Sequence, residues 1–276
     1  MTTATNSPER FSNKRLGNKL QQLERWLADR APVAVGFSGG VDSTFLAAVR
    51  LRAIPHQTLL IRADNPLATT PERAEVPTDS PLRSLPLVTV PFDPLSAPHI
   101  AQNGPQRCYH CKRLMFESIC SRAQAHGCST VIDGSNASDN LGDRPGIRAL
   151  QELGVRSPLL ELGWTKQEER ELLRAWGFAL WDRPDQACLA TRITTGRLST
   201  TALQKVRIAE DILHDAGFAN VRARLREGRI QVEIGANEVA GLQRNARGTC
   251  ALPATVREAF AAAGIDDADP IATIRR

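Results

Sequence analysis

Short apolar runs in the first half of the chain alternate with segments of helical periodicity. The first run, Val33 to Phe37, is apolar and rich in valine, which is typical of a strand buried on both faces. A glycine-rich turn follows it, and the pattern over 44–51 predicts a helix. Similar runs predict further strands over 57–61, 85–90 and 130–132. Strands that alternate with helices indicate a parallel sheet.

Apolar side chains at intervals of three and four residues predict the helices around these strands. Leucines at this spacing predict an amphipathic helix over 16–29, preceded by a loose tail, and residues 112–126 predict another helix. Thr165 and Glu168 stand in the register of a capping box, so a helix should run from there to a C-cap near Gly177.

The pattern changes after Leu198. A helix over 200–218 is followed by two alternating segments, VRARLR and RIQVEI, which predict a hairpin with a turn at Glu227 and Gly228. Alternate residues of the first strand are arginines that share its outer face: Arg222, Arg224 and Arg226.

These elements together predict an α/β protein with a doubly wound, mostly parallel sheet and a smaller C-terminal α+β domain. We expect an N-terminal tail and helix over 1–29, the sheet domain over 30–180, and a loop leading into the second domain over 181–276. The segment 66–105 is rich in proline and polar residues, so its helices should be short, and we expect part of it to loop over the site.

The turn after the first strand reads SGGVDS and consists of Ser38, Gly39, Gly40, Val41, Asp42 and Ser43. Adjacent glycines let backbone N–H groups point inward, and the following helix adds partial positive charge, so the turn predicts a phosphate site. It is neither a Walker loop nor a dinucleotide turn. A carboxylate in an anion site is explained by Mg²⁺, which makes Asp42 a candidate metal ligand. The alternative is an ordinary turn capped by Ser43 or Asp42.

Polar residues also follow two other predicted strands. Asp64 ends the second strand, and Asp133, Ser135 and Asn136 follow the fourth. Ligands of doubly wound sheets bind at the carboxyl ends of the strands. Asp64, Asp133 and Asn136 are therefore candidate nucleotide-binding residues together with the loop.

Composition narrows the ligand class only slightly. The chain has 276 residues, 42% of them hydrophobic, and can bury the core of one large or two moderate domains. Its net charge of +5 and pI near 9.1 suit polyanions, either nucleotides or RNA. The N-terminus has no apolar signal-type region and no run approaches the length of a membrane span, so we expect a cytoplasmic protein.

Six cysteines are too few and too scattered for a disulfide scaffold at this length. Cys108 and Cys111 form a C-x-x-C pair, but the sequence holds no second pair, which favours reduced thiols at a helix start over a zinc site. Cys188 lies in a loop with Arg183 before it and Arg192 after it. Nearby cations favour the thiolate, so Cys188 is a candidate nucleophile; the alternative is a structural cysteine.

The arginine face of the predicted hairpin is a second candidate anion site. Side chains two apart on a strand stand about 7 Å apart, so the three arginines make a stripe suited to a phosphorylated ligand. The alternative is a solvated sheet face, partly neutralised by Glu233 across the hairpin. The spacing does not decide between them.

The loop SGGVDS resembles the PP-loop of ATP pyrophosphatases. The ordered set of motifs resembles one family, the ATP-dependent sacrificial sulfur transferases (LarE), which act in making the nickel-pincer nucleotide cofactor. The resemblance covers roughly residues 30–235. Besides the loop, its motifs are RCYHCK, DGSNASDNLGDRPG, GVRSPLLELGWTKQEER, WDRPDQACLATR, VRIAE and VRARLREGRIQVEI.

The resemblance implies an adenine nucleotide alpha hydrolase-like fold, ATP and Mg²⁺ as cofactors, and a closed homo-oligomer. The implied substrate is a small molecule, a pyridinium dicarboxylate mononucleotide, which is adenylated on a carboxylate. Cys188 then donates its sulfur, which leaves dehydroalanine in the protein and a thiocarboxylate on the product. The residues implied at this second site are Arg192, Arg222 and Arg224 for substrate binding and Glu210 and Glu233 as acidic catalytic positions.

Other functions stay open on the sequence. A PP-loop tRNA thiolase would use the basic surface as an RNA footprint, although no appended RNA-binding motif is present. A non-catalytic nucleotide-binding protein would need no donor cysteine. A variant within the family carries sulfur on an iron–sulfur cluster held by three cysteines, but Cys188 has no cysteine neighbour in its loop. A last phosphate-binding arginine is either Arg276 or absent.

Overall fold

The computed structural model describes residues 8–139, 145–238, 242, 249–265, 268 and 271–275. These residues fold as two compact units. The first unit runs to residue 64 and also includes 74–92 and 108–183; the second comprises 65–73, 93–107 and the chain from 184 onward. The first unit contains a four-stranded parallel sheet and the second a separate mixed sheet, which confirms the predicted fold class.

The first unit is built on four parallel strands in the order β3-β2-β1-β4, and all four were predicted from the sequence. Their bounds are β1 (Val33–Gly36), β2 (Thr58–Asp64), β3 (Leu87–Pro91) and β4 (Thr130–Ile132). The chain adds β2 and β3 on one side of β1 and then places β4 on the other side. The strand order therefore reverses between β1 and β4, where open α/β sheets bind their ligands.

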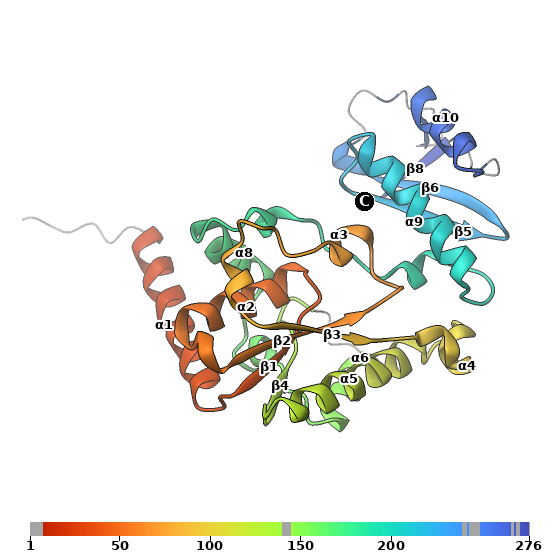
Figure 1. Cartoon of the computed structure of the whole chain (residues 1–276). Helices are drawn as coiled ribbons and strands as arrows, with labels where there is room; N and C mark the ends of the chain where they lie inside the picture. The colour runs from red at the N-terminus through yellow and green to blue at the C-terminus, as the bar shows by residue number, and fades with distance from the viewer. Residues whose placement is uncertain are drawn as a thin grey trace, which may run out of the picture. The chain divides into compact units, whose positions relative to one another are not determined.

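Helices cover both faces of this sheet (Figure 1). They are α1 (Pro8–Ala28), α2 (Val41–Ala53), α5 (Arg107–Ala125), α6 (Pro145–Glu152), α7 (Pro158–Glu161) and α8 (Lys166–Ala175). Val33 and Val35 of β1 pack into a core that includes side chains of α1, α2 and α8, whereas Ala34 packs on the opposite face against Phe116 and Ile119 of α5. Alternate residues of one strand thus contribute to two apolar layers.

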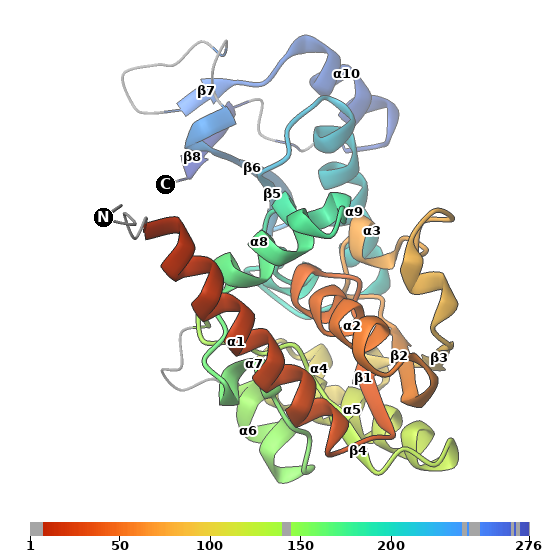
Figure 2. The same ribbon diagram turned by 90° about the vertical axis from the view of Figure 1, so that its left-hand side faces the viewer.

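Helix α1 begins earlier than the sequence predicts. The leucine spacing indicated a start at residue 16 after a loose tail, but the helix starts at Pro8 and continues past α2 and α7 (Figure 2). Its first turns lack a repeating apolar residue, so no hydrophobic period marks them, while Pro8 suits the first position of a helix. None of the helices in the described ranges is long and apolar enough to cross a lipid bilayer.

The second unit has a mixed sheet in the order β5-β6-β8-β7. Its strands are β5 (Val221–Arg226), β6 (Arg229–Gly235), β7 (Thr249–Ala251) and β8 (Ile271–Arg275). The predicted β5–β6 hairpin is confirmed, and its turn residues Glu227 and Gly228 have φ values of 50° and 84°, as a type I′ turn requires. The sequence analysis predicted neither β7, which has only three residues, nor β8.

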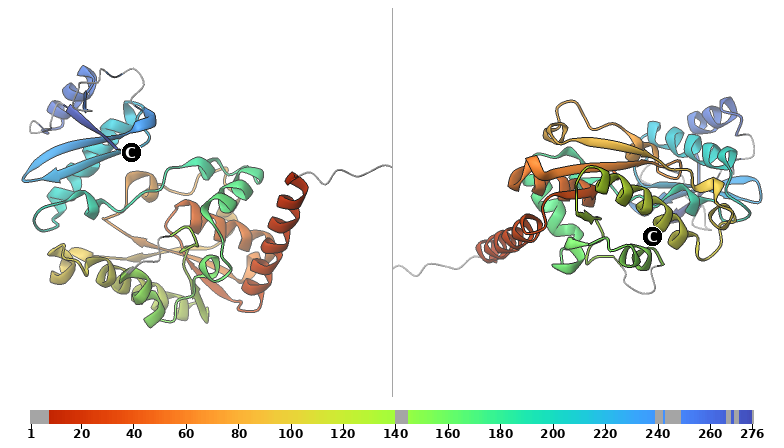
Figure 3. Two further views of the ribbon diagram at one scale, coloured as in Figure 1. Left: turned by 180° about the vertical axis from the view of Figure 1, so that it is seen from behind. Right: turned by 60° about the horizontal axis from the view of Figure 1, so that its bottom comes forward.

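Helix α9 (Thr200–Asp215) crosses one face of this sheet (Figure 3). It buries Leu203, Val206, Ala209 and Leu213, while β5 and β6 bury Val221, Ala223, Ile230, Val232 and Ile234. The remaining helices are α10 (Ala254–Ala262) and two single turns, α3 (Thr70–Arg73) and α4 (Pro98–Ala101). The expectation that helices between 66 and 105 are short is confirmed.

Helix α8 provides a direct test of the predicted capping box. Glu168 Oε2 accepts a hydrogen bond from Thr165 N at 2.8 Å, and Thr165 Oγ1 accepts one from Glu168 N at 3.4 Å. We expect Thr165→Ala to lower the free energy of unfolding by about 1 kcal/mol in urea denaturation, because it removes this cap. The control Thr201→Ala, at an exposed position of α9, should change it little; equal losses in both variants would contradict the capping role.

Candidate functional site

The loop between β1 and α2 has the geometry of an anion cradle. Gly39 has a φ of 80°, and Ser43 Oγ accepts a hydrogen bond from Ser38 N at 3.2 Å and lies 3.1 Å from Ser38 Oγ. The N-cap of α2 is Gly40, which makes no side-chain cap bond. Ser43 and Asp42 therefore do not occupy the cap position, and the first N–H groups of α2 face the loop without a capping side chain.

Asp42 is the centre of polar contacts in this loop. Asn136 Nδ2 donates to Asp42 Oδ1 at 2.8 Å, and Lys166 Nζ lies 2.5 Å from the same oxygen. A Cβ atom added to Gly134 would stand 2.9 Å from Asp42 Cβ, so this close approach of the β4 end to the loop requires glycine. The structure thus brings Asn136 to Asp42, as the strand-end pattern suggested.

Lys166 is one functional candidate that the sequence analysis missed. The loop itself contains no lysine, but the first residue of α8 supplies one, 124 positions after Asp42. The Lys166 ammonium neutralises the Asp42 carboxylate and stands beside a loop suited to phosphate. The sequence around Lys166 shows only that it directly follows the helix N-cap Thr165. It does not indicate that Lys166 pairs with Asp42.

The other strand-end carboxylates have different surroundings. Asp133 is buried, and its two oxygens accept hydrogen bonds from Ser135 Oγ at 2.7 Å and Ser157 Oγ at 2.6 Å. Lys112 Nζ lies 3.6 Å from Asp133 Oδ2. Asp133 therefore holds the β4 end in place, whereas Asp64 lies exposed at the end of β2.

Glu169, one turn after Lys166, is fully buried and lies next to Asp42 and Asn136. Burial, followed by the nearby Asp42 carboxylate, raises the pKa of Glu169 to about 10. The burial of Glu169 could not be predicted from the sequence, because acidic residues are common in the exposed first turn of a helix.

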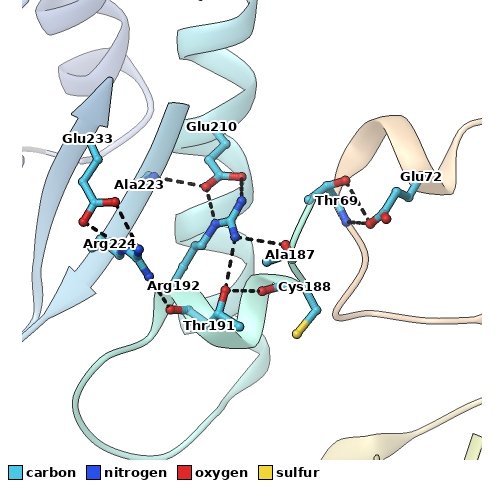
Figure 4. Close-up of polar contacts among 10 residues, drawn as sticks. All are labelled: Thr69, Glu72, Ala187, Cys188, Thr191, Arg192, Glu210, Ala223, Arg224 and Glu233. Carbon is cyan, nitrogen blue, oxygen red and sulfur yellow. Dashed lines mark hydrogen bonds and ion pairs between the residues drawn. The ribbon is translucent and has the colours of Figure 1, made fainter. Parts of the chain in front are cut away.

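The second candidate site surrounds Cys188 in the second unit (Figure 4). Cys188 is a half-buried free thiol at the start of a 3₁₀ turn over Leu189–Arg192. The turn is fastened by Leu189 N, which donates to Leu67 O at 2.7 Å. Arg107 Nη1 lies 3.8 Å from Cys188 Sγ and donates a hydrogen bond to it.

The structure gives the Cys188 thiol a hydrogen bond from Arg107, in addition to the two arginines that flank it in the sequence, Arg183 and Arg192. Arg183 Nη1 donates to Gly39 O at 3.3 Å in the first unit, and the guanidinium of Arg192 is committed to Glu210. Arg107 reaches the thiol from a position 81 residues before the cysteine. It belongs to the motif RCYHCK, which the sequence analysis had considered only for its cysteines.

Arg192 and Glu210 form a buried ion pair with side chains 1% and 4% exposed. Arg192 Nε donates to Glu210 Oε1 at 2.7 Å, and Ala223 N of β5 donates to the same oxygen at 3.1 Å. Arg192 Nη1 donates to Ala187 O at 3.0 Å and to Thr191 Oγ1 at 3.1 Å. The pair therefore fastens residues on both sides of Cys188, through the Ala187 carbonyl and the Thr191 hydroxyl, to α9 and β5.

The arginine face of the hairpin is partly neutralised. Glu233 stands opposite Arg222 in the strand register, yet its carboxylate accepts from Arg224 Nε at 3.0 Å and Nη2 at 3.1 Å. Arg224 Nη1 also donates to Thr191 O at 2.8 Å, in the turn that carries Cys188. Arg222 and Arg224 are half-buried and Arg226 is exposed. Arg224 thus links this face to the turn that carries Cys188.

The remaining sequence candidates add little to either site. Cys108 is exposed and Cys111 half-buried near the start of α5, in agreement with the expected helix start. Arg276, considered as a further phosphate ligand, lies outside the described residues.

The contact between Arg107 and Cys188 can be tested by the reactivity of the thiol. A guanidinium stabilises the thiolate, which is the form that alkylates. We expect Arg107→Gln to slow iodoacetamide labelling of Cys188 several-fold at pH 7, followed by peptide mapping, and Arg107→Lys to retain most of the rate. Arg197→Gln, at an exposed position of the same unit, is the matched control. Equal rates in all four proteins would show that the contact does not activate the thiol.

No protein-family model matches the chain. Three relatives do. The uncharacterized protein slr1717 of Synechocystis is 32% identical over 79% of this chain and 82% of its own length. The pyridinium-3,5-bisthiocarboxylic acid mononucleotide synthase of Lactiplantibacillus plantarum is 28% identical over 79% of this chain and 80% of its own length. The uncharacterized protein MJ0830 of Methanocaldococcus jannaschii is 28% identical over 73% of this chain and 77% of its own length.

The synthase of L. plantarum is a LarE enzyme, so the predicted resemblance is supported as distant homology at the level of a PP-loop, sulfur-related enzyme family. The higher identity is to a relative without an assigned activity. By that match, this chain belongs to the same protein family as slr1717 of Synechocystis.

Proposed function

We propose that this protein is an ATP-dependent sulfur transferase that adenylates a carboxylate of a pyridinium mononucleotide and then transfers the sulfur of its own Cys188. The printed name of the L. plantarum relative supports the substrate class. The loop from Ser38 to Ser43 supports the use of a nucleotide. The single observation that carries the proposal is the Arg107 guanidinium beside Cys188 Sγ, in the unit that also presents Arg222 and Arg224.

The first step takes place at the loop of the first unit. The substrate carboxylate attacks the α phosphorus of ATP, the bond between the α phosphorus and the bridging oxygen breaks, and pyrophosphate leaves with that electron pair. Backbone N–H groups of the loop and the Lys166 ammonium hold the negative charge of pyrophosphate. The Asp42 carboxylate and the neighbouring Glu169 carboxyl would hold Mg²⁺, which would neutralise phosphate charge when bound.

The second step uses the thiol. The Cys188 thiolate attacks the activated carbonyl, and AMP leaves, which gives a thioester. Removal of the Cys188 α proton then breaks the bond between Cβ and sulfur, so the sulfur leaves with its electron pair as a thiocarboxylate and dehydroalanine remains. In this scheme Glu210 holds the turn through Arg192, and Glu233 orients Arg224 toward the phosphate of the substrate.

A sacrificial donor is consumed by its own reaction, so turnover should stop after one sulfur per active site. After incubation with ATP, Mg²⁺ and the pyridinium dicarboxylate mononucleotide, intact-mass measurement should show a loss of about 34 Da, one sulfur and two hydrogens. Peptide mapping should locate dehydroalanine at position 188.

The variant Cys188→Ser separates the two steps. It should still release pyrophosphate, because the loop belongs to the other unit, yet form no thiocarboxylate. Many turnovers by the parent protein with an unaltered residue 188 would overturn the sacrificial mechanism and indicate an external sulfur source.

The arginine face should recognise the phosphate of the substrate. We expect Arg222→Ala and Arg224→Ala each to weaken binding of the pyridinium mononucleotide about tenfold in calorimetric titrations, because each removes a charge-assisted hydrogen bond. Affinity for ATP should change little, since these residues lie in the second unit. Arg226→Ala, at the exposed end of the same strand, is the control. Equal losses for both ligands would contradict the assignment.

A further inference from the structure

The segment 93–107 of the second unit ends at Arg107, whose Nη1 donates to Cys188 Sγ at 3.8 Å. The chain turns toward this arginine directly after Asn103, and Arg107 N donates to Gly104 O at 3.0 Å, which closes the turn. A functional side chain keeps its position only where the backbone that carries it is fixed. The contact with the sulfur therefore depends on how the segment is attached to the rest of the unit.

Asn103 provides the side-chain attachment. Its Nδ2 donates to Ile193 O at 2.8 Å, and Ile193 directly follows the 3₁₀ turn next to the thiol. A backbone bond reinforces this attachment, from Leu198 N to Ala101 O at 2.8 Å. Ile193 is itself fixed, because it forms a bridge with Leu225 of β5. The segment with the guanidinium and the chain with the thiol are thus joined at two points besides the contact at the sulfur.

The backbone of Asn103 adopts a conformation that few residues tolerate. Its φ is 58°, and among the described residues Glu227, in the hairpin turn, is the only other non-glycine residue with a positive φ. Asparagine tolerates this left-handed region better than most residues. A residue held in such a conformation points to a functional constraint. Here the constraint is to turn the chain toward Arg107 while the amide stays bonded to Ile193 O.

We propose that Asn103 is a positioning residue of the sulfur donor, which holds the Arg107 guanidinium at Cys188 Sγ through its bond to Ile193 O. Loss of the amide would free the segment and let the guanidinium move from the sulfur, which disfavours the thiolate. This inference deepens the proposed function and rests on it in one respect, namely that Cys188 acts as a nucleophile.

Two other arginines bonded to the turn have different roles. Arg192 pairs with Glu210, and Arg224 pairs with Glu233. Both arginines also donate to backbone carbonyl groups around the thiol, at 3.0 Å and 2.8 Å. They hold the backbone of the turn, whereas Arg107 donates to the sulfur itself.

The experiment measures iodoacetamide labelling of Cys188 in the full-length protein by peptide mapping at pH 7 and at pH 10. We expect Asn103→Gly, which permits the left-handed backbone but removes the amide, to slow labelling several-fold at pH 7. At pH 10 its rate should equal that of the parent, because a thiol with an ordinary pKa of about 8.5 is then ionised without a cation. Gln102→Gly, at the exposed neighbouring position, adds similar chain freedom and should change neither rate.

A double variant separates positioning from a general loss of structure. If Asn103 acts through Arg107, Asn103→Gly should cause no further loss at pH 7 in an Arg107→Gln background. Additive losses would overturn the proposal, as would a parent-like rate of Asn103→Gly at pH 7. An equal change at both pH values would also overturn it, because Asn103 would then control access to the sulfur and not its charge.

Labelling requires neither ATP nor a substrate. Its outcome is therefore independent of the loss of about 34 Da at Cys188, which tests the proposed function.

Discussion

The position of Asp42 is the constraint on which the first unit's site depends. The reversal of strand order between β1 and β4 brings the end of β4 next to the loop, and Gly134 allows a backbone approach that any side chain would block. Asn136 and Lys166 then meet one carboxylate from elements that are far apart in the sequence. The loop therefore gains from tertiary structure the lysine that a Walker loop carries in its own sequence.

In the second unit, the buried ion pair of Arg192 and Glu210 holds the turn that carries Cys188. The pair of Arg192 and Glu210 is almost fully buried, and removing two ions from water costs so much that such pairs are weak evidence of stability. The pair instead holds the chain around Cys188 in place, because its other hydrogen bonds are to Ala187, Thr191 and Ala223. A reactive thiol must be held in place without being enclosed. A buried ion pair behind the turn achieves this with the sulfur only half-buried.

Local patterns explain why the sequence predicted most of the fold and only part of the sites. The four parallel strands, the capping box at Thr165 and the turn at Glu227 and Gly228 follow from periodicity and backbone preference over a few residues. Strand β8 pairs in parallel with β6, and five residues carry no signal of a partner so far away. Contacts such as those of Arg107 with Cys188 are unpredictable for the same reason, because they depend on how separate segments pack.

The surroundings of the six cysteines distinguish a donor more sharply than their spacing does. Burial raises the pKa of the Cys120 and Cys128 thiols, and Cys250 is buried with its Sγ donating to Ala272 O at 3.7 Å, so these three suit the core. Cys108 and Cys111 lie at the start of α5 and form the C-x-x-C pair. Cys188 combines partial exposure, a guanidinium at hydrogen-bond distance and a turn fastened from behind. A thiol that must attack once and then lose its sulfur needs these three conditions together, because access, thiolate charge and a fixed position each limit the attack on a carbonyl.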